Sequence, residues 1–113
     1  MALQYSNITG DSVQTLIAKN IVLNDTTGQY DRIFNSSLIS SISICNNHAT
    51  DLVSVDLYVY DATLGTYYIL NSAVIPSGVT LSLDSKDAAF DNDSYEMRIK
   101  LNAAGSTVSV IIK

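Results

Sequence analysis

One cysteine and one histidine lie close together in the sequence, as Cys45 and His48. A thiol beside an imidazole is a pair that nucleophilic catalysis can use, because the base takes the proton from the attacking group. No second polar group beside His48 is evident that would complete such a site. The simpler interpretation is that Cys45 ends a strand as a small apolar residue and that His48 belongs to the following loop. We therefore predict that the protein is not an enzyme.

Acidic residues gather between positions 84 and 96, where an oxygen-rich loop could hold calcium. They are Asp84, Asp87, Asp91, Asp93 and Glu96. Their spacing lacks the central glycine and terminal glutamate of an EF-hand loop, so a solvated polar loop is the favoured interpretation. One cysteine and one histidine cannot supply the four ligands of a structural zinc site. The five glycines form no phosphate-binding motif. We predict no metal site and no cofactor.

The charge balance narrows the classes of partner. The net charge is −5 and the isoelectric point is near 4.4. Nucleic acids and anionic membranes both bind clustered basic residues, so we expect neither as a partner. The start of the chain does not resemble a signal peptide, and no apolar run approaches the roughly 20 residues of a membrane helix. We expect synthesis in a cytoplasm and no secretion.

The elements that must position all these residues are predicted to be strands. In the run LVSVDLYVYD, residues 52–61, aliphatic residues occupy every second position from residue 53 to residue 59. They are Val53, Val55, Leu57 and Val59, and they alternate with Ser54, Asp56, Tyr58 and Tyr60. Because successive strand side chains point to opposite faces, this run has one aliphatic face and one polar-aromatic face. It is typical of a half-buried strand at the centre of a sheet.

Similar alternation recurs in residues 38–46, 79–84, 95–101 and 107–112, with polar turns between the runs. Residues 66–71 and 73–75 read as further short strands, and residues 85–93 as a loop. Residues 11–23 fit either a helix or two short strands, and we favour two strands. The pattern predicts an all-β protein, an antiparallel β-sandwich of seven to eight strands that is Ig-like or jelly-roll-like. Residues 1–12 are a possible N-terminal arm or edge strand, and residues 13–113 form a single domain.

Tyrosines are the remaining candidates for function. Tyr58 and Tyr60 lie opposite the aliphatic face of their run, and the adjacent Tyr67 and Tyr68 fall on opposite faces of the next strand. Exposed tyrosines among serines and asparagines are typical of contact surfaces. The alternative is that both faces of the sheet are covered by protein. We select Tyr5, Tyr58, Tyr60 and Tyr68 as the candidate interaction surface.

Residues 38–113 resemble small virion structural proteins of tailed phages, notably phages of marine cyanobacteria. The resemblance is carried by the segments SISICNNHATDLVSVDLYVYD, TYYILNSAVIPSGVTLSLD, FDNDSYEMRIKL and VSVIIK, in this order. The first 37 residues show no such resemblance.

The resemblance implies a non-enzymatic structural protein of the virion, first of all a capsid decoration or cement protein. It implies capsid or tail proteins of the same particle as partners, and a homo-oligomer with a trimer favoured. The alternatives are a neck, tail or fibre component, or a carbohydrate-binding module for host-surface glycans. Against the last, the chain has no tryptophan, which such modules usually expose.

Overall fold

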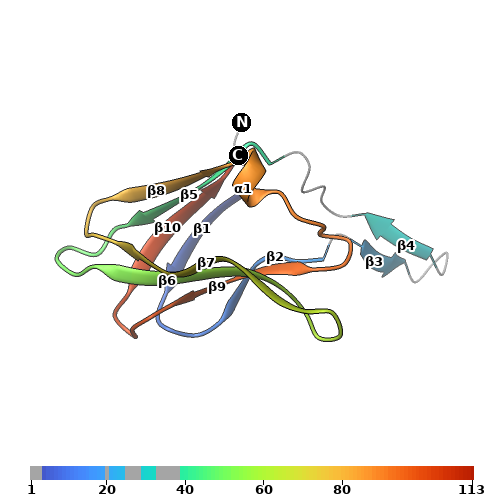
Figure 1. Ribbon diagram of the computed structural model, residues 1–113, viewed down its shortest axis with the longest axis horizontal. Coiled ribbons are helices and arrows are strands. Elements are labelled where there is room, and N and C mark those ends of the chain that lie inside the picture. Colours follow the sequence, from blue (N-terminus) through green and yellow to red (C-terminus); the bar gives the residue numbers. More distant parts are fainter. Residues whose placement is uncertain (1–3, 20, 25–28, 33–38) are drawn as a thin grey trace.

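Two four-stranded antiparallel sheets face each other in the computed structural model, which describes residues 4–19, 21–24, 29–32 and 39–113 (Figure 1). Sheet A has the order β1 (Gln4–Thr9), β10 (Thr107–Ile112), β5 (Ser41–Asn46) and β8 (Thr80–Asp84). Sheet B has the order β2 (Gln14–Ile17), β9 (Glu96–Leu101), β6 (Val53–Asp61) and β7 (Gly65–Ile75). The predicted all-β antiparallel sandwich is confirmed.

The strand pairs are nested along the chain. β1 pairs with β10, β2 with β9, β5 with β8, and β6 with β7, so the chain behaves as one long hairpin. Successive pairs alternate between the two sheets, and the pairings of β10 with β5 and of β6 with β9 complete each sheet. This is the connectivity of a jelly roll, not of an immunoglobulin sandwich.

The interior follows from the alternation in the sequence. All four predicted aliphatics of β6 are buried, as are Met97, Ile99 and Leu101 of β9 and Val108, Val110 and Ile112 of β10. From β5, Ile42 and Ile44 join the same cluster. Burying one such side chain contributes about 1.5–3 kcal/mol relative to leaving it exposed, so this shared interior is what holds the two sheets together.

The region that fitted either a helix or two strands contains two strands. β2 joins sheet B, and β3 (Ile21–Asn24) pairs with β4 (Gln29–Arg32) in a separate hairpin that projects from the sandwich (Figure 1). Residues 4–9 form β1, so the edge-strand alternative describes this part of the N-terminal segment. Residues 1–3, and Leu38 at the start of a predicted strand, lie outside the described residues.

Two expectations about the later strands and loops need correction. Residues 65–75 form the single strand β7 instead of two, because a bulge at Ser72, with φ of 54°, absorbs the irregularity. The Asp56 carboxylate holds that bulge by accepting the backbone N–H of Ser72 at 2.7 Å. The predicted loop after β8 begins with one helical turn, α1 (Ser85–Ala88), which Asp84 caps by accepting the backbone N–H groups of Lys86 and Asp87.

Within the described residues, α1 is the one helix. No helix of these residues is long and apolar enough to cross a bilayer.

Candidate interaction surfaces

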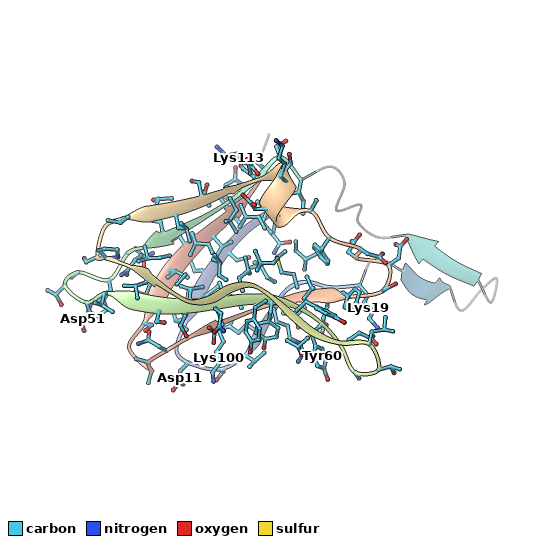
Figure 2. The ribbon with its side chains drawn as sticks, viewed as in Figure 1. Asp11, Lys19, Asp51, Tyr60, Lys100 and Lys113 are labelled. Carbon is cyan, nitrogen blue, oxygen red and sulfur yellow. The ribbon has the colours of Figure 1, made fainter. Side chains whose placement is uncertain are left out.

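The outer face of sheet B carries three of the four predicted tyrosines. Register places Arg98 of β9, Tyr58 of β6 and Tyr68 of β7 in one row across the sheet. Glu96 and Tyr60 form the next row. We call the residues Tyr58, Tyr60, Tyr68, Glu96 and Arg98 the aromatic face. Figure 2 shows Tyr60 and Lys100 on this outer side and Lys113 on the far side of the molecule.

Ring and charge contacts give the aromatic face a fixed arrangement. The rings of Tyr58 and Tyr68 lie 5.2 Å apart between centroids, tilted by 47°. The guanidinium carbon of Arg98 lies 3.9 Å from the centre of the Tyr60 ring, a cation–π geometry. Glu96 Oε1 accepts from Arg98 Nε at 2.6 Å, which holds the guanidinium in place. These contacts hold the aromatic and charged groups of this face in one arrangement.

Tyr58, which we predicted as a contact residue, offers little surface to a partner, since only 8% of it is exposed. Tyr68 and Arg98 flank it, and burial raises the pKa of its phenol although the Arg98 charge opposes the rise. The buried Tyr58 ring packs against the Tyr68 ring and so supports the aromatic face. Tyr68, 55% exposed, is the ring that a partner can reach, and Tyr60 is half-buried under Arg98.

Tyr67 points to the opposite face from Tyr68, as the sequence predicted. It pairs in register with the inward-facing Val59 and packs edge-on against Tyr95, with centroids 5.9 Å apart. It is nonetheless 59% exposed, because it lies near the end of the β6–β7 hairpin.

Tyr5 does not belong to this surface. It lies on β1 opposite Ile111 of β10, on the outer face of sheet A, and is 73% exposed. The four predicted tyrosines therefore do not form one surface, because the roll puts β1 and β6 in different sheets. Alternation places a residue on a face but does not tell which sheet the strand joins.

A salt bridge marks the rim of the aromatic face. Lys19 donates to the Asp61 carboxylate, whose pKa falls to about 2, chiefly through this hydrogen bond and further through the N–H groups of Leu64 and Thr63. These two N–H groups donate to Asp61 Oδ2 at 2.9 Å and shape the turn after β6. Lys19, Tyr60, Asp61, Ala62 and Glu96 line a shallow hollow of about 280 Å³ here.

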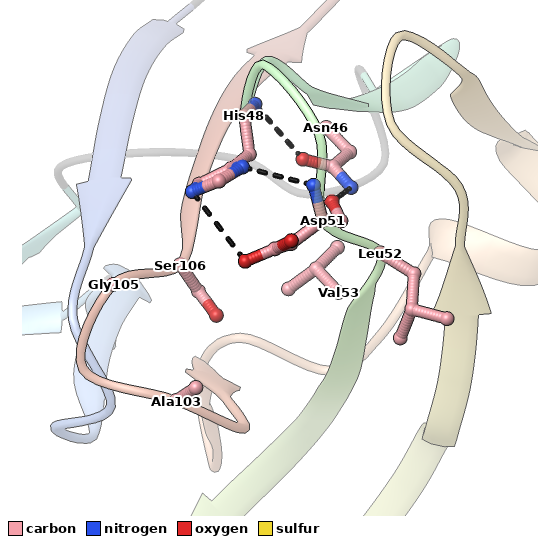
Figure 3. A pocket seen from close by; sticks show the side chains of 8 residues that line it. All are labelled: Asn46, His48, Asp51, Leu52, Val53, Ala103, Gly105 and Ser106. Atoms are coloured by element: carbon pink, nitrogen blue, oxygen red, sulfur yellow. Dashed lines mark hydrogen bonds and ion pairs between the residues drawn. The ribbon is translucent and has the colours of Figure 1, made fainter.

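His48 is one of the residues that line a small pocket of about 160 Å³ (Figure 3). His48 Nδ1 accepts the backbone N–H groups of Thr50 at 3.2 Å and Asp51 at 3.0 Å. Accepting both bonds requires Nδ1 to be unprotonated, so the neutral ring carries its proton on Nε2, which faces the Asp51 carboxylate at 3.8 Å. In this tautomer Nε2 is a donor and is not available as a base.

The loop around this pocket is built on Asn46, which is fully buried. Its amide nitrogen donates to the carbonyls of Asp51 and Ile75, both at 2.9 Å, and its amide oxygen accepts the N–H of His48 at 3.0 Å. The side chain thereby joins the end of a sheet A strand to the end of β7 in sheet B. The sequence analysis missed this residue, although its place on the buried parity of residues 42–46 was a usable signal.

The hypothetical Cys45/His48 pair is not assembled. Cys45 lies on the outer face of sheet A, between Ser109 of β10 and Thr80 of β8, whereas His48 lines the pocket at the end of the strand. Among the described residues, no group of three or more histidine, cysteine or acidic side chains could hold a metal ion. The carboxylates between positions 84 and 96 bond locally, for example Asp91 with the N–H of Asp93 at 3.1 Å.

Searches against protein-family models, curated proteins and solved structures found no match to this chain.

Proposed function

We propose that this protein is a structural component of a phage particle, a capsid decoration protein that attaches to the shell through its aromatic face. The proposal combines the resemblance of residues 38–113 to phage virion proteins with the jelly-roll connectivity of the two sheets. Jelly rolls occur in capsid proteins and also in lectins and cupins, so the fold alone does not separate these functions. The side chains on the outer faces of the sheets must therefore distinguish between these functions.

The arrangement of Tyr68, Tyr60 and Arg98 is the observation that supports a protein partner. Tyrosine and arginine are the residues that most often dominate the binding energy of protein interfaces. Here Glu96 immobilises Arg98, and the buried Tyr58 supports Tyr68 from one side. Side chains that are already ordered lose less conformational entropy when a partner docks, which favours binding.

The same geometry weighs against a glycan. A sugar ring stacks on an open aromatic face, and two or more coplanar rings extend such a platform. Arg98 covers the Tyr60 ring, Tyr58 is buried, and the Tyr58 and Tyr68 planes are tilted by 47°. Tyr68 is left as a single exposed ring, which is a better anchor for a protein surface than a platform for a saccharide.

Co-sedimentation with purified particles tests the proposal. The particles are first stripped of this protein and then incubated with recombinant wild-type chain or with Tyr68→Ala. We expect wild-type chain to bind and Tyr68→Ala to lose about tenfold or more in affinity, as at an interface hot spot. Leu52→Ala, an equally exposed apolar residue beside the His48 pocket, is the matched control and should bind like wild type.

Mass spectrometry of separated capsids and tails tests the location. Recovery with capsids supports a decoration protein, and recovery with tails or fibres replaces it by the tail alternative. Absence of the protein from purified particles would contradict the particle role altogether.

A further inference from the structure

The outer face of sheet A carries almost no charge, in contrast to the rest of an acidic chain. Register arranges its side chains in three successive rows across β1, β10, β5 and β8. The rows are Tyr5, Ile111, Ser43 and Ser82; then Asn7, Ser109, Cys45 and Thr80; then Thr9 and Thr107. We call these ten residues the hydroxyl face. None of them is acidic or basic, whereas the whole chain has a net charge of −5.

Hydrogen bonds already order part of the hydroxyl face. Asn47 Nδ2 donates to Ser109 Oγ at 2.8 Å, and Ser109 in turn donates to Asn7 Oδ1 at 3.0 Å. The hydroxyls of Ser43 and Ser82 lie 3.4 Å apart. These groups each combine donor and acceptor atoms, so the face can present matching partners to an identical face.

We infer that the hydroxyl face is where a second copy of this chain docks. Two copies with a net charge of −5 repel each other, and they can approach closely only where neither presents unpaired charge. A surface that offers both donors and acceptors is complementary to itself, as a two-fold interface requires. The exposed ring of Tyr5 and the side chain of Ile111 add apolar area to the same patch.

The charges at one end of the face fix the orientation of the pair. Lys113 lies opposite Ser41 of β5, and Ser41 lies opposite Asp84 of β8, so one row has a cation and an anion on either side of β5. A two-fold axis running along β5 brings Lys113 of each copy opposite Asp84 of the other. The same axis brings the two Cys45 side chains, and the two Ser43 side chains, close together.

Face-to-face packing about a two-fold axis closes after two copies. The inference therefore predicts a dimer and differs from the trimer that the resemblance implies. It does not depend on the particle role, because the hydroxyl face and the aromatic face lie on opposite sides of the sandwich.

The size of the patch sets the concentration at which to look. Four strands spaced by ~4.8 Å and about six residues of ~3.4 Å give a projected patch on the order of 400 Å². Two such patches together cover about 800 Å², which is less than the roughly 1,000 Å² expected of a stable interface, so we expect a weak, transient dimer. Light scattering between about 1 µM and about 500 µM should show the mass rising from 12.2 kDa towards twice that value. A constant 12.2 kDa over this range, or a trimer, would overturn the inference.

A charge swap at Ser43 tests the interface itself. Ser43→Lys alone and Ser43→Glu alone each place two like charges at the axis, so each should dimerise at least about tenfold more weakly than wild type. An equimolar mixture of the two variants should recover the dimer, because opposite charges then meet. This recovery also shows that both variants are folded. Thr66→Lys, an exposed position on sheet B, is the matched control and should dimerise normally. Failure of the mixture to recover the dimer would place the interface elsewhere.

Cys45 provides an independent distance measurement on the unmodified sequence. In the proposed pair the two sulfurs lie within roughly 15 Å, since both are on an inner strand of facing sheets. A flexible bis-maleimide of that span should convert the wild-type chain to a covalent dimer, and Thr66→Lys equally, while Ser43→Lys should lose most of the product. Equal cross-linking of wild type and Ser43→Lys would contradict the inference.

Discussion

The two outer faces of this sandwich are built on the same interior but differ in chemistry. The aromatic face of sheet B combines rings with an ordered ion pair, whereas the hydroxyl face of sheet A has ten residues without a charge. A face with charges and an exposed ring suits a different molecule, which can supply the complement. A face of neutral donors and acceptors suits a copy of itself. Under the two proposals above, this small roll assigns heterologous contacts to sheet B and self-association to sheet A.

The largest effects are expected in the interior that both faces share. Leu57→Ala under the aromatic face and Ile44→Ala under the hydroxyl face each remove a fully buried side chain. Each should lower the free energy of unfolding by about 2–5 kcal/mol. Urea denaturation followed by circular dichroism measures both. If one variant melted only its own sheet while the other sheet stayed folded, the two faces would not rest on a common core.

The second-largest effect is expected at Asn46, whose side chain joins the two sheets. Asn46→Ala removes the donor for the buried carbonyl of Ile75, the donor for the partly buried carbonyl of Asp51, and the acceptor for the N–H of His48. Leaving such groups unsatisfied should cost about 2 kcal/mol or more. Asn71→Ala, at an exposed position of β7, is the matched control and should stay within about 0.5 kcal/mol of wild type. A negligible loss for Asn46→Ala would mean that the sheets are joined by apolar packing alone.

Tyr58 offers a smaller effect that is specific to the aromatic face. Its pKa lies above the usual 10.0 because burial disfavours the phenolate. The folded state thus keeps a proton that the unfolded chain releases, so the contribution of Tyr58 to stability is complete below pH 10 and is lost as pH rises through the raised pKa. Absorbance at the tyrosinate band, compared between wild type and Tyr58→Phe, isolates this titration.

Arg98→Met should raise the pKa of Tyr58 further, because the guanidinium charge lowers it. A Tyr58 midpoint at or below 10.0 would contradict the rise in pKa that we attribute to burial.

The smallest expected effect is that of added salt, which should change the interactions of the two faces differently. Added salt screens the repulsion between two copies with a net charge of −5, so dimerisation should strengthen by a few-fold between low and physiological ionic strength. The interaction of the aromatic face, which includes Arg98 and Glu96, should weaken or stay unchanged. Weaker dimerisation in salt would show that ion pairs, not neutral groups, hold the copies together.

The sequence predicted the interior better than the exterior. The alternation correctly predicted that the aliphatic residues of 53–59, and Met97, Ile99 and Leu101, are buried, because the face of a strand residue depends only on its parity. Which strands are neighbours depends on pairing across the whole chain. Alternation therefore could not place Arg98 beside Tyr58, separate Tyr5 from the other tyrosines, or show that Tyr58 is covered. These long-range pairings decide what each surface contains.

The first and last strands of the roll are partners, and this affects how the chain folds during synthesis. β10 lies between β1 and β5, so sheet A stays divided until residues 107–112 have left the ribosome. The hairpin of β6 and β7 can form early, because its strands are adjacent in the chain, but β1 must wait until its partner β10 has been made. Nascent chains stalled before Thr107 should therefore remain protease-sensitive and prone to aggregation, since they expose the open edges of β1 and β5.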